Sequence, residues 1–185
     1  MLKIGDKKLI NAWAFYDWAN SVYSLVISTA VFPLFYSAIT KDEIVTFLGM
    51  KWDYPDTLYS YALSFSFLVV AFMSPILSAI ADYTGNKLKF MKFFCWLGGL
   101  SVISMYFFKD LNTAWIGIIC TILASIGFWS SIVFYNSYLP EVAHPEQQDA
   151  ASAKGFIHGY IGSIILLLIC LGMILAPNTF GFDTS

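Results

Sequence analysis

A carboxylate stands inside the first long apolar segment of the sequence. Asp17 is followed by Asn20, Ser21, Ser24 and Ser28, and this spacing of three and four positions places them along one face of an α-helix. A charged side chain inside a membrane costs roughly 3 kcal/mol or more, and such residues are typically functional. We therefore expect a helix that lines a polar cavity, with Asp17, Asn20 and Ser24 as candidates for binding a polar solute or a proton. The alternative is that Asp17 lies at the membrane interface and only caps the helix or extends toward water.

Two later apolar segments carry further polar groups. Tyr135 and Asn136 lie where the fourth segment ends, and they either line a substrate path or mark the membrane interface. His158 lies near the start of the fifth segment, between Gly155 and Gly159. A neutral histidine exchanges protons near neutral pH, so His158 is another candidate proton site, and a packed structural histidine fits the sequence equally well. The two glycines form a small-xxx-small pair, which predicts close packing against another helix.

The sequence lacks the motifs of familiar catalytic and metal sites. It contains no nucleophile elbow, phosphate loop, dinucleotide fingerprint or HExxH zinc motif. Its 2 histidines are scattered, and its 3 cysteines lie in apolar runs without metal-ligand spacing. We therefore expect no catalytic residue, no metal, no cofactor and no enzyme activity.

The composition is that of a membrane protein. Of 185 residues, 58% are hydrophobic and 12% are charged, whereas soluble domains contain roughly 45–50% and 25%. The net charge is −2 and all 10 basic residues are lysines, so no basic surface is available to bind nucleic acid. These numbers argue against a soluble enzyme, a nucleic-acid binder and a disordered protein.

Five apolar stretches are long enough to cross a bilayer, since a spanning helix needs about 20 mostly apolar residues. They lie at approximately 11–39, 58–81, 90–108, 114–138 and 153–176. The short alternating runs of a sheet protein are absent. We expect an all-α integral membrane protein, with residues 1–185 forming a single membrane domain. Asp149 is expected to cap the fifth helix, because a carboxylate accepts from free backbone N–H groups.

The distribution of lysines predicts the orientation in the membrane. They are concentrated before the first span and between the second and third spans: Lys3, Lys7, Lys8, Lys87, Lys89 and Lys92. Because lysine-rich connections stay on the cytoplasmic side, we expect a cytoplasmic N-terminus and, after five crossings, a C-terminus on the opposite side. The second and third spans are then joined on the cytoplasmic side by a tight reversal at Gly85-Asn86.

That reversal resembles the signature loop of the major facilitator superfamily. Asp82, Gly85 and Lys87 match the signature, whereas the other signature positions differ: Ser78 replaces a glycine, and Tyr83 and Leu88 replace basic residues. Two further blocks, residues 13–23 and 134–141, resemble one subfamily. It includes the vacuolar amino-acid effluxers of fungal autophagy and many bacterial relatives.

The resemblance implies a secondary active transporter of a small polar solute that works by alternating access, with amino-acid efflux as one activity. In such transporters two halves of roughly six helices each rock about a central site. The loop with Asp82, Gly85 and Lys87 would then be a conformational gate that steadies one state by contacting the other half. This implies a missing C-terminal half or a partner subunit, beside the lipid bilayer and the solute.

A bacterial inner membrane is the location that the resemblance favours. Because the chain has five spans, we expect the N-terminal part of a longer transporter. The alternative is a non-transporting assembly or regulatory partner, or the remnant of a truncated gene.

Overall fold

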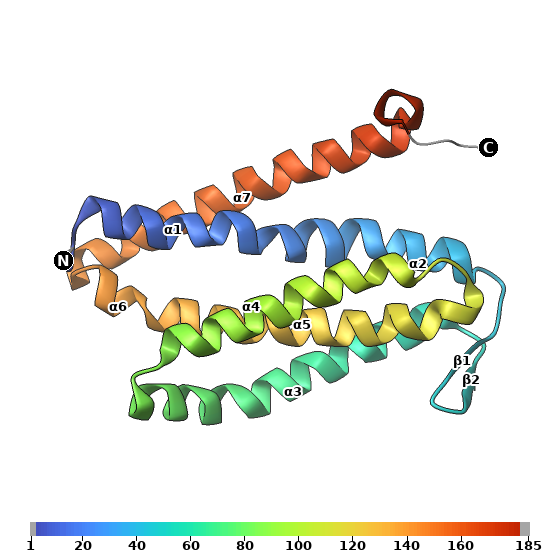
Figure 1. Cartoon of the computed structure of the whole chain (residues 1–185), viewed down its shortest axis with the longest axis horizontal. Coiled ribbons are helices and arrows are strands. Elements are labelled where there is room, and N and C mark those ends of the chain that lie inside the picture. The colour runs from blue at the N-terminus through green and yellow to red at the C-terminus, as the bar shows by residue number, and fades with distance from the viewer. Residues whose placement is uncertain (1–2, 182–185) are drawn as a thin grey trace. The chain divides into compact units, whose positions relative to one another are not determined.

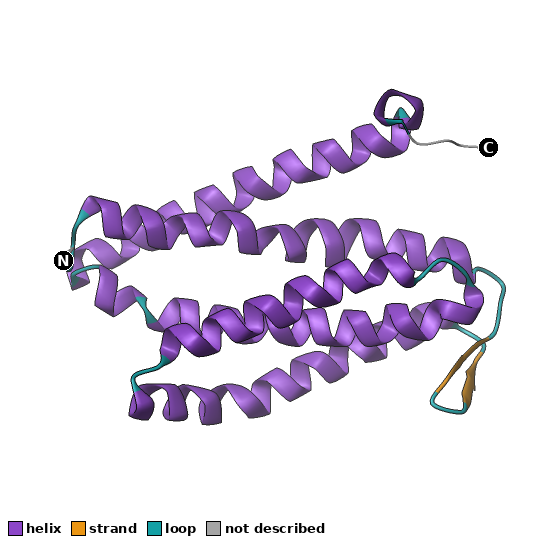
Figure 2. Cartoon of the chain, in the orientation of Figure 1, coloured by secondary structure: helices purple, strands orange, loops and turns teal. Residues whose placement is uncertain are grey.

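The fold is helical throughout most of its length (Figures 1 and 2). The computed structural model describes residues 3–181. In this range, 5 helical segments are long and apolar enough to cross a membrane: Lys7–Thr40, Pro55–Tyr83, Lys87–Phe107, Leu111–Ser137 and Pro145–Leu175. The predicted all-α integral membrane fold is therefore confirmed.

The first span is not a uniform α-helix. It consists of α1 (Lys7–Val22), a π-helical stretch (Tyr23–Val31) and α2 (Phe32–Thr40). The remaining helices are α3 (Pro55–Thr84), α4 (Lys87–Ser104), α5 (Ala114–Ser137), α6 (Leu139–Val142) and α7 (Pro145–Leu175). Short 3-10 turns cover Met105–Phe107, Leu111–Thr113 and Pro177–Phe180.

A small β-hairpin occupies the connection between α2 and α3, where the sequence predicts a loop. Its strands are β1 (Val45–Phe47) and β2 (Met50–Trp52), paired antiparallel. Leu48 and Gly49 join them with φ values of 50° and 78°. Positive φ at both central residues belongs to the tight turns that fit the twist of a hairpin. Strands of 3 residues are too short to produce a recognisable alternation.

The start of α7 differs from the sequence expectation. The helix begins at Pro145 with His144 as its N-cap residue, so the expectation that Asp149 caps it is wrong. Proline suits the first helical position because its φ is already helical and no N–H is lost from the ladder. The side chain of Gln147 accepts from the backbone N–H of His144 at 3.2 Å. His144, Pro145 and Gln147 therefore start the helix at Pro145, whereas the apolar residues alone predicted a span that begins near 153.

The chain folds as two compact units. One contains the chain up to Phe32 and again from Leu139, and the other contains Pro33–Tyr138. In the first unit, α1 and α7 pack closely against each other. Gly162 allows this contact, since a Cβ atom there would lie 2.7 Å from the backbone oxygen of Trp18.

In the second unit, α5 is the central helix. α3 and α4 contact α5 far more extensively than they contact each other. A Cβ atom on Gly127 of α5 would lie 2.5 Å from the backbone nitrogen of Gly98 and 2.7 Å from the oxygen of Phe94. On the other side, Ser66 Oγ of α3 donates to the backbone oxygen of Ile122 at 3.4 Å. Because lipid tails are as apolar as leucine, helices in a membrane associate through such close packing and hydrogen bonding.

We expect Gly127→Ala to destabilise the chain. The new Cβ atom meets backbone atoms of α4, which cannot rotate away, so the helices must separate at a cost of about 1–3 kcal/mol in the free energy of unfolding. Gly99→Ala on α4 is the control, because nothing lies within 4 Å of its Cβ position and alanine suits a helix interior better than glycine by about 1 kcal/mol. Thermal unfolding of the chain in detergent, followed by tryptophan fluorescence, measures both. Equal unfolding midpoints for the two variants would contradict the close contact.

Candidate functional site

Asp17 lies on the face of α1 that meets α7. Ser21 Oγ donates to Asp17 Oδ1 at 3.1 Å. Opposite them, a Cβ atom on Gly159 would lie 2.5 Å from Ser21 Oγ and 3.2 Å from Asp17 Oδ2. The carboxylate is half-buried. Because Gly159 of α7 has no side chain, the side chains of Asp17 and Ser21 have room at this position.

His158 lies among aromatic rings beside the same seam, which is the contact face between α1 and α7. Its ring centroid is 6.5 Å from that of Phe15 and 6.4 Å from that of Trp18. Both partners belong to α1, so α7 presents His158 to the helix that carries Asp17. The proton site and the packed histidine both stay predictions for His158.

The π-helical stretch changes the polar face that the sequence predicts. Asp17, Asn20 and Ser21 lie in α1, where α-helical spacing holds, but Ser24 lies beyond the change to π-helix. There Thr29 Oγ1 donates to the backbone oxygen of Ser24 at 2.7 Å. The π-helix is rare in proteins, and its short insertions into α-helices occur frequently at functional sites. The polar face with α-helical spacing is thus limited to Asp17, Asn20 and Ser21.

A polar contact between α1 and α7 escaped the sequence analysis. Lys154 Nζ donates to Asn11 Oδ1. This hydrogen bond places the ammonium group of Lys154 near the beginning of α1, in the same seam as Asp17. The only signal in the sequence is one lysine at the edge of an apolar run, and its partner lies far away in the chain.

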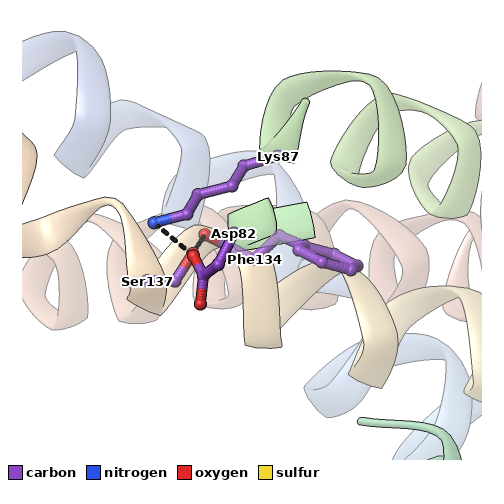
Figure 3. A network of polar contacts seen from close by, with 4 residues as sticks. All are labelled: Asp82, Lys87, Phe134 and Ser137. Atoms are coloured by element: carbon purple, nitrogen blue, oxygen red, sulfur yellow. Dashed lines mark hydrogen bonds and ion pairs between the residues drawn. The ribbon is translucent and has the colours of Figure 1, made fainter. Parts of the chain in front are cut away.

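The signature loop forms the tight reversal predicted between the second and third spans. α3 ends at a Gly85 whose φ of 64° is left-handed, and α4 begins directly after Asn86. Lys87 Nζ lies 2.9 Å from Asp82 Oδ1. Figure 3 shows this ion pair beside Ser137, in the last turn of α5.

Tyr135 and Asn136, the remaining candidates, belong to a different unit from Asp17 and His158. Tyr135 and Asn136 lie near the end of α5, with Tyr135 buried and Asn136 exposed. They belong to the unit Pro33–Tyr138, whereas Asp17 and His158 belong to the other unit. Tyr135 and Asn136 therefore stay sequence predictions. Among residues 3–181, no group of three or more His, Cys, Asp and Glu side chains is arranged to hold a metal ion.

Comparison with known proteins gives this arrangement a context. Residues 5–184 match the profile of the family described as Vacuole effluxer Atg22 like. The chain belongs to this family. Family membership and the apolar helices together make it a multi-pass membrane protein of a transporter family rather than of an enzyme family.

Individual proteins are also similar to this chain. "Uncharacterized MFS-type transporter YxiO" of Bacillus subtilis (strain 168) is 38% identical over 165 residues, which are 89% of this chain and 37% of the relative. Autophagy-related protein 22 of Coccidioides immitis (strain RS) is 24% identical, over 73% of this chain and 28% of the relative. A protein of Aquifex aeolicus (strain VF5) is 27% identical, over 91% of this chain and 40% of the relative.

The Bacillus relative, which is described as an MFS-type transporter, confirms the resemblance to the major facilitator superfamily that the signature loop indicated. The chain spans between 28% and 40% of their lengths. No solved structure matches the chain significantly.

We expect Gly159→Ala to push Ser21 away from Asp17 and to lower the free energy of unfolding by about 1–3 kcal/mol. Combining it with Ser21→Gly removes the colliding hydroxyl, so the double variant should be more stable than the sum of the two single changes by about 0.5–3 kcal/mol. Gly172→Ala, also on α7, is the control, since its Cβ atom would make only an ordinary contact at 3.8 Å with the Phe180 ring. Denaturant titration measures all four variants. Strict additivity would rule out the contact.

We expect Gly85→Ala to destabilise the loop through backbone strain alone. No atom lies within 4 Å of the Cβ position, so the cost is that of a left-handed φ, about 1–2 kcal/mol. Gly85→Asn should cost less, because asparagine adopts this conformation more readily. The unfolding midpoint in a sodium dodecyl sulfate titration distinguishes the variants. An alanine variant as stable as the asparagine variant would show that the turn tolerates another conformation.

Proposed function

We propose that this chain is the N-terminal part of a secondary active transporter that moves a small polar solute by alternating access. The observation that carries the proposal is the Asp17 carboxylate, held by Ser21 in the seam between α1 and α7. A carboxylate inside a spanning helix is costly and is typically retained for a functional reason. The position of Asp17 in the apolar first span of a transporter-family member supports this role.

The chemistry of the pair favours a solute with an amino group. A half-buried carboxylate attracts an ammonium cation, and charge-assisted hydrogen bonds are about twice as strong as neutral ones. Ser21 bonds one oxygen of Asp17, Oδ1. We propose that the other oxygen, Oδ2, accepts from the amino group of an amino acid or carries a coupling proton. Efflux is the direction that the description of the family favours.

The signature loop is proposed to be the conformational gate. Lys87 and Asp82 form an ion pair, but the side chain of Asp82 stays 62% exposed. A carboxylate that is both paired and accessible can exchange its lysine for another donor when the transporter changes state. Because the chain covers 37% of its Bacillus relative, we propose that this donor belongs to a further membrane part, either more of the same chain or a partner subunit.

We also propose a bacterial inner membrane as the location, with the N-terminus in the cytoplasm. The lysines before and at the start of α1 and those around the α3–α4 turn support this orientation. Asp82 and Lys87 then lie on the cytoplasmic side, where the gate would open or close the path from the cell interior.

Asp17→Asn is the test of the proposed transport site. The change is made in the gene as it stands in its own genome, so that the protein has its natural length. Loss of the carboxylate should lower amino-acid efflux from preloaded cells at least about tenfold, the effect of one lost charge-assisted contact of roughly 1.5–3 kcal/mol. Asp53→Asn in the exposed connection between β2 and α3 is the matched control and should transport normally.

Western blotting of the membrane fraction confirms equal amounts of the two variants. Normal efflux by the Asp17 variant would sink the proposed role of the carboxylate. If deletion of the gene leaves efflux of all amino acids unchanged, the alternative of a non-transporting assembly or regulatory partner replaces the transport proposal. Co-purification with a larger membrane protein would then support that alternative.

A further inference from the structure

An apolar groove lies between α3 and α4, with Ile126 of α5 among its lining residues. It exists because both outer helices pack on α5 and make few contacts with each other. Its volume is about 670 Å³, and its apolar walls include Met73, Leu77, Phe93, Leu97 and Ile126. Sites that bury a drug-sized ligand measure roughly 300–1,000 Å³, so the groove has room for one acyl chain.

One end of the groove is polar and basic. Asn86 and Lys89, at the start of α4, are the polar residues among those that line it. Lys89 is exposed, and it lies in the first turn of an 18-residue helix, where partial positive charge favours an anion. Lys87 is already engaged by Asp82 at 2.9 Å, so Lys89 supplies the positive charge of the groove.

We propose that this groove binds one phospholipid with an anionic headgroup. The acyl chain lies along the apolar walls, and the phosphate meets the ammonium group of Lys89 and the amide of Asn86. Basic pockets between spanning helices bind acidic lipid headgroups in this way. The groove's own charge selects the lipid: its single cation is complementary to a net negative headgroup such as phosphatidylglycerol. The choline of phosphatidylcholine would bring a second cation to the same end.

The test is native mass spectrometry of the protein, produced from its gene at natural length, in mild detergent with equal amounts of phosphatidylglycerol and phosphatidylcholine. The chain should retain one phosphatidylglycerol in preference to phosphatidylcholine. Lys89→Gln should weaken this binding about fivefold, the factor expected for one lysine at an anionic surface. Lys89→Arg keeps the charge and should retain the lipid.

Lys92→Gln is the matched control. It removes the same charge from the same helix at an exposed position that does not line the groove, so lipid binding should stay unchanged. Leu97→Trp fills the apolar part of the groove and should weaken retention of the lipid while leaving Lys89 in place.

Three results would overturn the proposal. Equal binding of the two lipids would show that the headgroup is not selected. Equal losses in Lys89→Gln and Lys92→Gln would show attraction to the basic surface in general. A dimer that holds no lipid and is dissociated by Leu97→Trp would identify a second copy of the chain as the occupant.

Discussion

The close approach of helix backbones at glycine residues is the constraint on which both units depend. In lipid, apolar side chains gain little by leaving the membrane for another helix, so helices associate where their surfaces fit closely. Gly127 lets α5 reach the backbone of α4, and Gly159 and Gly162 let α7 reach α1. Each position lacks the Cβ atom that would separate the helices. The contacts between the helices thus depend on the absence of a side chain at these positions.

The same constraint places the carboxylate of Asp17. It lies with Ser21 on the face of α1 that meets the glycines of α7, so the polar pair is partly shielded by a helix backbone rather than by bulky side chains. Backbone contact on one side leaves the aromatic residues of α1 to pack around His158. A bulkier residue in place of Gly159 would change the geometry of the site as well as the stability of the seam.

The packing around α5 explains two features of the second unit. Because α3 and α4 both use α5 as their main partner, a groove stays between them. The turn that joins them must reverse the chain within very few residues, and the left-handed Gly85 accomplishes this. Lys87 follows immediately and reaches Asp82 beside the last turn of α5 (Figure 3). Helix packing and the signature loop are therefore parts of one local arrangement.

The sequence by itself determined the membrane class, the five spans, the reversal at Gly85-Asn86 and the family resemblance, because hydropathy and turn chemistry are properties of neighbouring residues. Only the tertiary structure decided which residues meet. Three such pairs join helices that are far apart in the chain: Gly159 with Ser21, Gly127 with Gly98, and Lys154 with Asn11. The spacing of residues within one helix carries no information about these pairs. The change to π-helix after Val22 and the short hairpin were also missed, since nothing in the residue pattern distinguishes them from an α-helix and a loop. The sequence could identify Asp17 as a candidate, whereas helix packing decided which residues of α7 lie beside it.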